Sequence, residues 1–188
     1  MLSKKWATLF LTVVLSLLMS CTANIKEYQH TAPAFHLDEF FSGKLMAYAI
    51  VLDRHGNLQR RFVADISANW QDGVGIVDEW FTYDDGEMMT RQWRLVKAGD
   101  GTYYGTAGDV VGRAEGEESG AAFYWKYPLL ITIDNTEYEV MLDDWMFLIV
   151  EKRLINKTEI SKFGFKVGEV IIFIEKVEPT QIPVEKSL

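Results

Sequence analysis

The feature that most constrains the fold of this chain is an alternation of apolar and polar residues with a period of two. It is clearest in residues 58–70, where even-numbered positions are mostly apolar and odd-numbered positions mostly polar, with Arg60 and Val63 as exceptions. A period of two places alternate side chains on opposite faces of a β-strand. We therefore predict a half-buried strand here, whose interior face carries Phe62 and Ile66.

Turn-forming residues separate a series of such segments along most of the chain. They include His55-Gly56-Asn57, Asp84-Asp85-Gly86, Asp134-Asn135 and the glycine-rich residues 112–120. Gly, Asn and Asp tolerate the positive backbone angles of tight hairpins. We predict strands at residues 43–52, 58–70, 74–83, 87–97, 102–111, 121–133, 137–150 and 166–177, whereas residues 153–162 could form a short helix or another strand.

The spacing of these segments, roughly ten residues, leaves no room for crossover helices. The sequence therefore predicts an all-β fold, an antiparallel up-and-down meander of roughly eight or nine strands. Closing the meander into a β-barrel would remove exposed edges and enclose a space for side chains or one small ligand. We expect Gly105, Gly108, Gly112, Gly116 and Gly120 to mark bends or bulges where the barrel turns.

Five short strings resemble the DUF3833 family, a group of bacterial envelope lipoproteins of unknown function. They lie at residues 79–86, 91–93, 105–112, 143–146 and 162–164, and the resemblance extends from about Phe40 to Lys176. It implies a lipocalin-like β-barrel, which we place at residues 40–178, in agreement with the predicted meander. It implies no assigned reaction and no catalytic residues.

The first 21 residues have the layout of an export signal followed by a lipid-attachment site. Lys4 and Lys5 precede an apolar stretch that ends at Leu18 and is shorter than the roughly 20 residues of a membrane-spanning helix. Residues 18–21, Leu-Met-Ser-Cys, then resemble the bacterial lipobox, which implies that the signal helix at residues 1–20 is removed and that Cys21 carries lipid. Cys21 is the only cysteine, so it has no partner for an internal disulfide, and acylation would remove a reactive thiol.

A lipid on Cys21 would hold the protein on the bacterial envelope through its acyl chains. Thr22 follows, not the Asp that resemblance to inner-membrane lipoproteins would imply, and this favours the outer membrane, facing the periplasm. Residues 21–39 show no sustained period and contain Pro33, so we expect a flexible tether. Residues 179–188 are expected to form a loose C-terminal tail.

The negative charge of the chain narrows the choice of partners. The formal charge is -8, and removal of residues 1–20, which contain Lys4 and Lys5 but no acid, makes it -10. An acidic body argues against binding to nucleic acid, whose phosphates require a basic surface. It also argues against electrostatic adhesion to anionic lipid, so we expect the acyl anchor to make the membrane contact. The sequence points to no particular protein partner.

The pair Asp143-Asp144 lies inside the mostly apolar residues 138–150, so one of these carboxylates should face the interior. A buried carboxylate costs free energy unless it is paired, and Arg91 is a candidate partner, as are Arg60, Arg61 and Arg94. Such a pair could be the polar floor of a ligand pocket or a structural salt bridge.

Large aromatic side chains are the other candidate for ligand contact, since they can line an apolar cavity as well as fill a core. A one-residue shift in register would turn any of them outward. The predicted ligand-binding residues are Phe62, Ile66, Arg91, Trp93, Trp125, Asp143 and Trp145.

No motif for catalysis or for metal binding stands out. Asp78-Glu79 and Asp84-Asp85 could in principle bind calcium or act as acid and base, but Asp84-Asp85-Gly86 fits a hairpin turn and lacks calcium-loop spacing. The three histidines are scattered, and there is no Gly-x-Ser-x-Gly elbow or phosphate-binding glycine loop. We therefore expect no catalytic residue, no metal and no cofactor.

Three functions of different classes fit these features. The leading hypothesis is a non-enzymatic outer-membrane lipoprotein whose barrel binds an apolar or amphipathic small molecule, such as a fatty acid or lipid. The second is an envelope scaffold or accessory subunit with a filled barrel and a protein partner on its surface. The third is a hydrolase or isomerase acting on lipid, which would need a nucleophile or a perturbed acid in a cleft.

Overall fold

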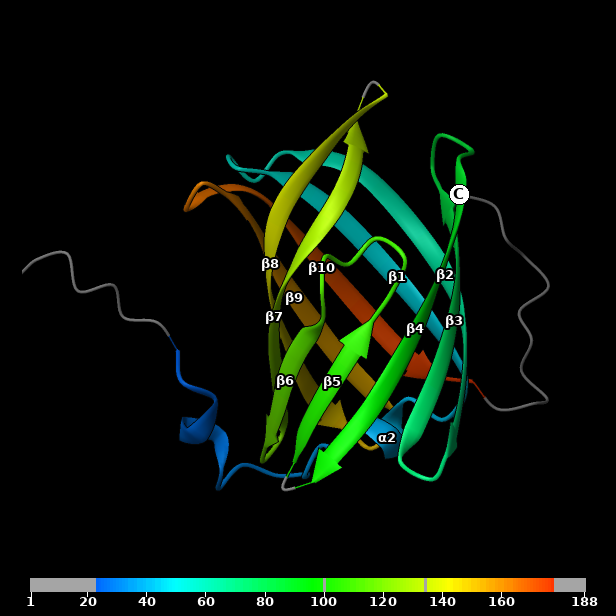
Figure 1. Ribbon diagram of the computed structural model, residues 1–188, viewed down its shortest axis with the longest axis vertical. Helices are drawn as coiled ribbons and strands as arrows, with labels where there is room; N and C mark the ends of the chain where they lie inside the picture. Colours follow the sequence, from blue (N-terminus) through cyan, green and yellow to red (C-terminus); the bar gives the residue numbers. More distant parts are fainter. Residues whose placement is uncertain (1–22, 100, 134, 178–188) are drawn as a thin grey trace, which may run out of the picture.

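Ten antiparallel strands close into a β-barrel in the computed structural model, which describes residues 23–99, 101–133 and 135–177 (Figure 1). Each strand pairs with its neighbours in sequence, and the last pairs with the first. The predicted all-β meander and its closure are thus confirmed, with ten strands instead of eight or nine. The strands are β1 (Gly43–Asp53), β2 (Leu58–Gln71), β3 (Val74–Tyr83), β4 (Met88–Gly99), β5 (Thr102–Thr106), β6 (Ala114–Ser119), β7 (Ala122–Ile133), β8 (Thr136–Val150), β9 (Arg153–Lys162) and β10 (Phe165–Lys176).

Strands β6 and β9 account for the higher strand count. The residues of β9, for which helix and strand were both open, form a strand paired with β8 and β10. Strand β6 forms within the glycine-rich stretch that was expected to be a turn, and β5 ends at Thr106, earlier than expected. A short loop, residues 107–113, joins β5 to β6 (Figure 1).

Two of the glycines expected at bends instead lie within strands and make room for large rings. A Cβ atom at Gly105 of β5 would lie 2.9 Å from Cζ3 of Trp125 and 3.2 Å from Cε3 of Trp93. A Cβ atom at Gly116 of β6 would overlap the ring of Phe123. Here the absence of a side chain serves packing and not a change of direction. Gly112 and Gly120 do have positive φ, at 75° and 52°.

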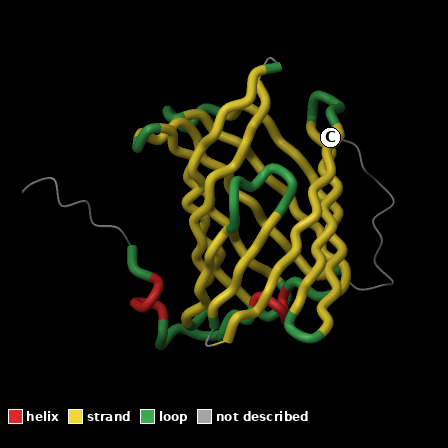
Figure 2. Tube along the Cα trace, viewed as in Figure 1, coloured by secondary structure: helices red, strands yellow, loops and turns green. Residues whose placement is uncertain are grey.

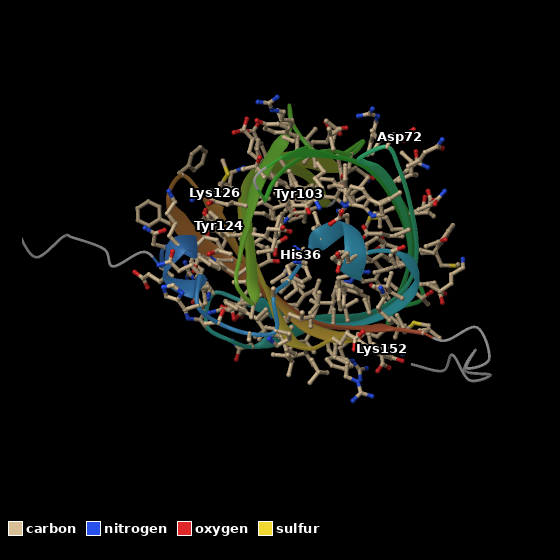
Figure 3. All side chains as sticks on the ribbon, turned by 90° about the horizontal axis from the view of Figure 1, so that it is seen from below. His36, Asp72, Tyr103, Tyr124, Lys126 and Lys152 are labelled. Carbon is tan, nitrogen blue, oxygen red and sulfur yellow. The ribbon has the colours of Figure 1, made fainter. Side chains whose placement is uncertain are left out.

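The N-terminal segment closes one end of the barrel, which we call the lower end. The helix α2 (Leu37–Phe40) lies inside the ring of strands there (Figures 2 and 3). The side chains of Phe35 and Leu37 are only 1% exposed. The expectation of a flexible tether is therefore wrong for residues 35–39, because the apolar side chains of Phe35 and Leu37 fill the end of the barrel.

Polar contacts fix this N-terminal segment, which we call the plug, to the strands around it. The hydroxyl of Tyr103 on β5 donates to Asp38 at 2.9 Å, and Lys97 on β4 donates to the same carboxylate at 2.8 Å. The indole of Trp70 on β2 donates to the Phe41 carbonyl at 2.7 Å. Upstream, the short 3₁₀ helix η1 (Ile25–Tyr28) packs outside the barrel against β6 and β7. The plug is thus bonded to three strands as well as packed against them.

Inward-facing side chains become less buried from the lower end toward the opposite, upper end. Near the plug, Leu45, Ala47 and Leu154 are fully buried. Toward the upper end, inward side chains that pack against the core are only half-buried, and they include Val51, Tyr83, Met89, Ile131, Ile160, Val170 and Ile172. The inward side chains are therefore well buried near the lower end and less well buried toward the upper end.

Some predictions fall on residues that the structure does not describe. The signal helix and Cys21 lie in residues 1–22, and the predicted tail lies in residues 178–188, so all three stay predictions. Among the described residues, no helix is both long and apolar enough to cross a membrane.

Candidate functional site

Three charged side chains meet inside the barrel, between its two ends. Strand pairing places Glu79 of β3 opposite both Ile66 of β2 and Arg91 of β4, so these side chains share the inner face. Arg91 Nε donates to the Asp109 carboxylate at 2.9 and 3.1 Å, and Nη2 donates to it at 2.6 Å. Arg91 Nη1 lies 4.0 Å from Glu79 Oε2. We call Glu79, Arg91 and Asp109 the inner charge cluster.

Glu79 is the incompletely paired member of the inner charge cluster. Protein atoms surround it, yet its side chain keeps 15% of its accessible surface and that of Arg91 keeps 17%. For enclosed side chains, this remaining surface faces the space inside the barrel. Glu79 Oε2 is shielded from solvent and has no hydrogen-bond partner. Burial raises the pKa of Glu79 to about 7, although the Arg91 guanidinium acts in the opposite direction.

Arg91 keeps its charge in this enclosed position. Burial disfavours the guanidinium, but the carboxylates of Glu79 and Asp109 outweigh that effect and hold the pKa of Arg91 above its ordinary value. The bidentate contact with Asp109 is the geometry in which an arginine–carboxylate pair is strongest. The guanidinium is thus already engaged by the protein itself.

A second inward carboxylate, Asp144 of β8, is fully hydrogen-bonded. It accepts from Trp125 Nε1 at 2.8 Å, from Thr158 Oγ1 at 2.9 Å and from Asn156 Nδ2, with the Tyr127 hydroxyl 3.5 Å away. Burial raises the pKa of Asp144, and the bonds from Asn156 and Trp125 oppose that rise. Since its acceptor positions are occupied, this group fits a structural role that ties β7, β8 and β9 together.

Aromatic rings form much of the inner wall beside these carboxylates. Trp93 and Trp125 stack with their ring centroids 4.8 Å apart, and the ring of Tyr127 meets both edge-on at 5.4 and 5.3 Å. On the other side, Phe62 packs against Phe81 with centroids 5.3 Å apart. The inner charge cluster is therefore surrounded by aromatic side chains.

The structure brings five of the seven predicted ligand-binding residues to the inner face, namely Phe62, Ile66, Arg91, Trp93 and Trp125. Asp143 and Trp145 lie on the outer face, contrary to the expected orientation. Asp143 accepts from Lys126 Nζ at 2.7 Å, and Trp145 packs against Tyr28 of η1 and Phe147. The inward positions of β8 are the even-numbered ones, including Leu142, Asp144 and Met146.

Sequence reasoning missed Glu79 and Asp109 as inner residues, and of the pair Asp143-Asp144 it chose Asp143 where the structure turns Asp144 inward. For Glu79 a signal was present: it follows Val77 and precedes Phe81 at intervals of two, so the alternation of β3 turns it inward. The nearby Asp78, Asp84 and Asp85 instead suggest a cluster of acids at the following turn. Asp109 lies in a loop, where no period indicates the direction of a side chain. Among the described residues, no group of three or more His, Cys, Asp or Glu is placed to hold a metal ion.

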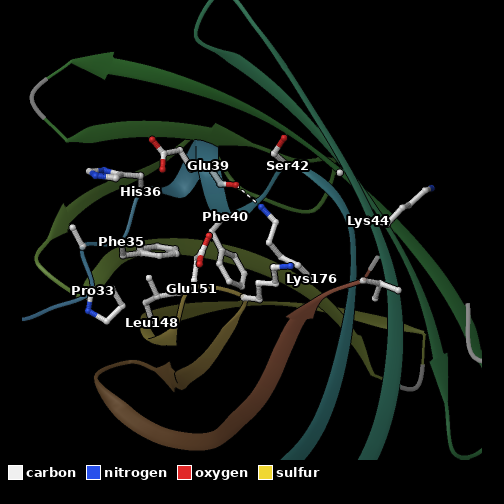
Figure 4. Close-up of a pocket in the computed structure, with 14 residues that line it drawn as sticks. Pro33, Phe35, His36, Glu39, Phe40, Ser42, Lys44, Leu148, Glu151 and Lys176 are labelled. Atoms are coloured by element: carbon white, nitrogen blue, oxygen red, sulfur yellow. Dashed lines mark hydrogen bonds between the residues drawn. The ribbon is translucent and has the colours of Figure 1, made fainter. Parts of the chain in front are cut away.

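A separate pocket of about 480 Å³ lies at the lower end, beside α2 (Figure 4). Its lining mixes apolar side chains such as Phe35 and Leu148 with charges of both signs, including Glu39 and Glu151. Lys176 Nζ donates to the Glu39 carbonyl at 2.6 Å. Among the described residues, the buried side-chain atoms without partners are Glu79 Oε2 and Arg60 Nε, and neither lines this pocket. The barrel interior is therefore the stronger candidate for a specific site.

Comparison with models of known protein families gives a match for this chain. A family model described as "Protein of unknown function (DUF3833)" matches residues 15–176. No curated protein matches the sequence.

Proposed function

The chain belongs to the DUF3833 family, whose description assigns no activity, and we propose that it is a binding protein for an apolar or amphipathic small molecule of the fatty-acid or lipid kind. The proposed site is the barrel interior, and the proposed entrance is the upper end. The proposal describes a carrier or sensor and not an enzyme, since it assigns no group to bond making or breaking.

The observation that carries this proposal is the rise in exposure of inward side chains toward the upper end. A barrel that served only as a scaffold would bury its inward side chains along its whole length, as this one does around Leu45 and Leu154. Above, apolar side chains such as Ile131, Ile160 and Val170 stay half-buried. Exposed apolar surface inside a barrel gains free energy when an apolar ligand covers it.

The two kinds of inner wall suit the two parts of an amphipathic ligand. Its chain would lie along the half-buried aliphatic side chains near the upper end. Its polar head would reach the inner charge cluster, where Glu79 Oε2 lacks a partner. A few polar groups in an otherwise apolar cavity are the usual way in which a site fixes the orientation of a ligand.

A pair of neighbouring substitutions on β10 tests the site. Val170 faces inward, opposite Val51, whereas Ile171 faces outward, opposite Ile50. We expect Val170→Trp to fill the space near the entrance and to reduce bound ligand by about tenfold or more, whereas Ile171→Trp leaves binding unchanged. Ligand is measured by native mass spectrometry of the full chain and by fluorescence of the neutral probe N-phenylnaphthylamine.

Stability measurements on the same two variants separate an open interior from a filled one. In a filled core, the added ring of Val170→Trp would cost about 1–3 kcal/mol. If the wild-type protein carried no ligand and bound no probe, while Val170→Trp was destabilised by that amount, the proposed function would be wrong.

We propose further that Cys21 carries an acyl anchor that holds the barrel on the outer membrane, facing the periplasm. The support is the lipobox-like string that ends at Cys21, after an apolar segment too short to span a bilayer. We expect Cys21→Ser to prevent incorporation of labelled fatty acid and to move the protein out of the membrane fraction. Unchanged labelling and fractionation would exclude this anchor.

An accessory subunit is the second candidate, and the outer surface of the barrel favours it. On β1, Tyr48 and Ile50 are outward and exposed, and they lie opposite the outward Phe173 and Ile171 of β10. Apolar side chains on adjacent strands of an outer face suit contact with another protein. This function would be supported if Ile171→Trp disrupted a native complex while probe binding was absent from wild type.

A further inference from the structure

We propose that the head group bound at the inner charge cluster is a hydrogen-bond donor without negative charge, a primary amine above all, and not a carboxylate. This inference rests on the proposed function and narrows its ligand class to lipids without an anionic head group, which excludes fatty acids. It follows from what the protein has already paired inside the barrel and what it has left unpaired.

Arg91, the inner group that would attract an anionic head, is already occupied. Its Nε and Nη2 both donate to Asp109, so a ligand carboxylate could bind these atoms only by displacing that side chain. At Nη1 it would meet the Glu79 carboxylate, whose Oε2 lies 4.0 Å away. The loop that carries Asp109 is itself held against β7: Leu130 N donates to the Asp109 carbonyl at 2.8 Å, and Val111 N donates to the Pro128 carbonyl at 3.0 Å. Displacement would therefore also disturb these backbone bonds.

Glu79, in contrast, offers an acceptor that the protein leaves empty. Its Oε2 is buried, has no hydrogen-bond partner and lies 4.0 Å from the nearest Arg91 nitrogen, beyond hydrogen-bonding distance. A buried polar atom without a partner is uncommon in a folded protein and calls for an explanation. A donor on the ligand would supply the missing hydrogen bond. A carboxylate head has only acceptor oxygens, so it could not donate to Glu79 Oε2.

The charge balance around Glu79 also favours a cation. The carboxyl groups there are Glu79 itself, Asp109 and Asp144, and the cation is Arg91. When all four groups are ionised, their formal charges sum to -2. Like charge disfavours an anion in an enclosed site, and opposite charge favours a cation there.

Arg60, nearer the upper end, does not reverse this balance. It also has a buried Nε without a partner, but its Nη2 contacts both Asp85 and Glu87 at 2.9 and 2.8 Å. Its guanidinium lies over the ring of Tyr83, 3.8 Å from the centroid. Two carboxylates beside one guanidinium leave this group negative as well.

The preference for an amine should depend on pH through Glu79. Four titratable groups face Glu79: Arg91 of β4, Asp109 of the β5–β6 loop, Tyr127 of β7 and Asp144 of β8. Since burial raises the pKa of Glu79 to about 7, this carboxyl is mostly neutral at about pH 6 and mostly ionised at about pH 8. Alkylamines stay protonated over this range, so the affinity for an amine should rise with pH.

Three ligands of equal chain length test the proposal: dodecylamine, dodecanol and laurate. Each displaces N-phenylnaphthylamine from the full-length protein, below its micelle-forming concentration. At about pH 8 we expect dodecylamine to bind about tenfold or more tightly than laurate, because it gains a charge-assisted bond to Glu79. At about pH 6 this ratio should fall.

Two carboxylate variants show whether the preference comes from the interior. Glu79→Gln should remove most of the amine preference and its pH dependence. Asp78→Asn is the matched control, since the adjacent Asp78 faces outward, where it accepts from Gln92 at 2.7 Å. It removes the same charge and should change neither. Near-ultraviolet circular dichroism of the stacked Trp93 and Trp125 checks that the interior is intact.

The outcomes distinguish this inference from the function on which it rests. Laurate binding as tightly as dodecylamine, or tighter, would overturn the choice of head group and leave the binding function standing. An equal loss of amine preference in Asp78→Asn and Glu79→Gln would also overturn it, since surface charge would then explain the effect. Binding of neither the probe nor any of the three ligands would overturn the proposed function as well.

Discussion

At the scale of single residues, Glu79 links stability to pH in an unusual direction for a carboxylate. Its pKa is raised to about 7 by burial, well above that of a glutamate in an unfolded chain. The folded state therefore holds a proton that the unfolded state has released between about pH 4.5 and 7. In this interval the free energy of unfolding falls as pH rises, by up to about 3 kcal/mol in total for such a shift.

Glu79→Gln should remove this part of the pH dependence. We expect urea unfolding of the wild type to show a lower stability at about pH 8 than at about pH 5, with a smaller difference in the variant. Burial also raises the pKa of Asp144, so both groups contribute to the dependence of the wild-type unfolding free energy on pH. The difference in this dependence between the wild type and Glu79→Gln gives the contribution of Glu79. If the unfolding free energy depended on pH identically in the two proteins, Glu79 would be ionised over the whole pH range.

The pair Asp143-Asp144 shows why single residues were predicted less well than strands. The sequence correctly indicates that one of these adjacent carboxylates faces inward, because a strand alternates. Choosing between them requires the register of β8, and both neighbours of the pair, Leu142 and Trp145, are large and apolar. Outside the barrel, Trp145 packs against Tyr124 and Phe147, and it also has a contact with Tyr28 of η1. That contact comes from a segment more than a hundred residues away and leaves no local trace.

At the scale of elements, Gly116 explains how one of the two short strands of the barrel wall is packed. It lies in β6, and a Cβ there would overlap the buried ring of Phe123 and lie 3.0 Å from the Cβ of Trp125. We expect Gly116→Ala to destabilise the fold by about 1–3 kcal/mol, since the ring has no free space to move into. Thermal or urea unfolding measures this loss.

Gly108 provides the matched control for that substitution. It lies in the β5–β6 loop, where a Cβ would meet nothing within 4 Å and φ is not in the left-handed region. Gly108→Ala should be neutral or slightly stabilising, because it reduces the freedom of the unfolded chain. Similar losses in the two variants would mean that the tight fit around Gly116 is not what limits stability there.

The same region marks the limit of element prediction from sequence. Long strands with clear alternation, such as β2 and β3, appear within a residue or two of their expected bounds. Strand β6 was missed because its glycines and glutamates have the composition of a turn. Its pairing with β7 and the room it gives to Phe123 decide its conformation, and both are tertiary effects that override local preference.

At the scale of the whole molecule, the barrel could be predicted because closure needs no information beyond the repeated meander. The plug could not, because residues 23–42 have neither period nor length enough to indicate an element. Their apolar side chains, among them Phe35 and Leu37, gain a buried position only once the ring of strands exists. The candidate site follows from that arrangement, since the plug lies at one end of the barrel and the proposed entrance is the other, less tightly packed end.

The pairing of β1 with β10 has a consequence for how the protein is made. It joins positions as distant as Leu45 and Lys176, so the ring can close only after almost the entire chain has been synthesised. Until then the sheet has two unpaired edges and an uncovered apolar face, the conditions under which chains aggregate. Such long-range closure also makes folding slow relative to proteins with local contacts. A nascent chain that stops before β10 therefore keeps unpaired strand edges and exposed apolar surface, which chaperones and proteases can recognise.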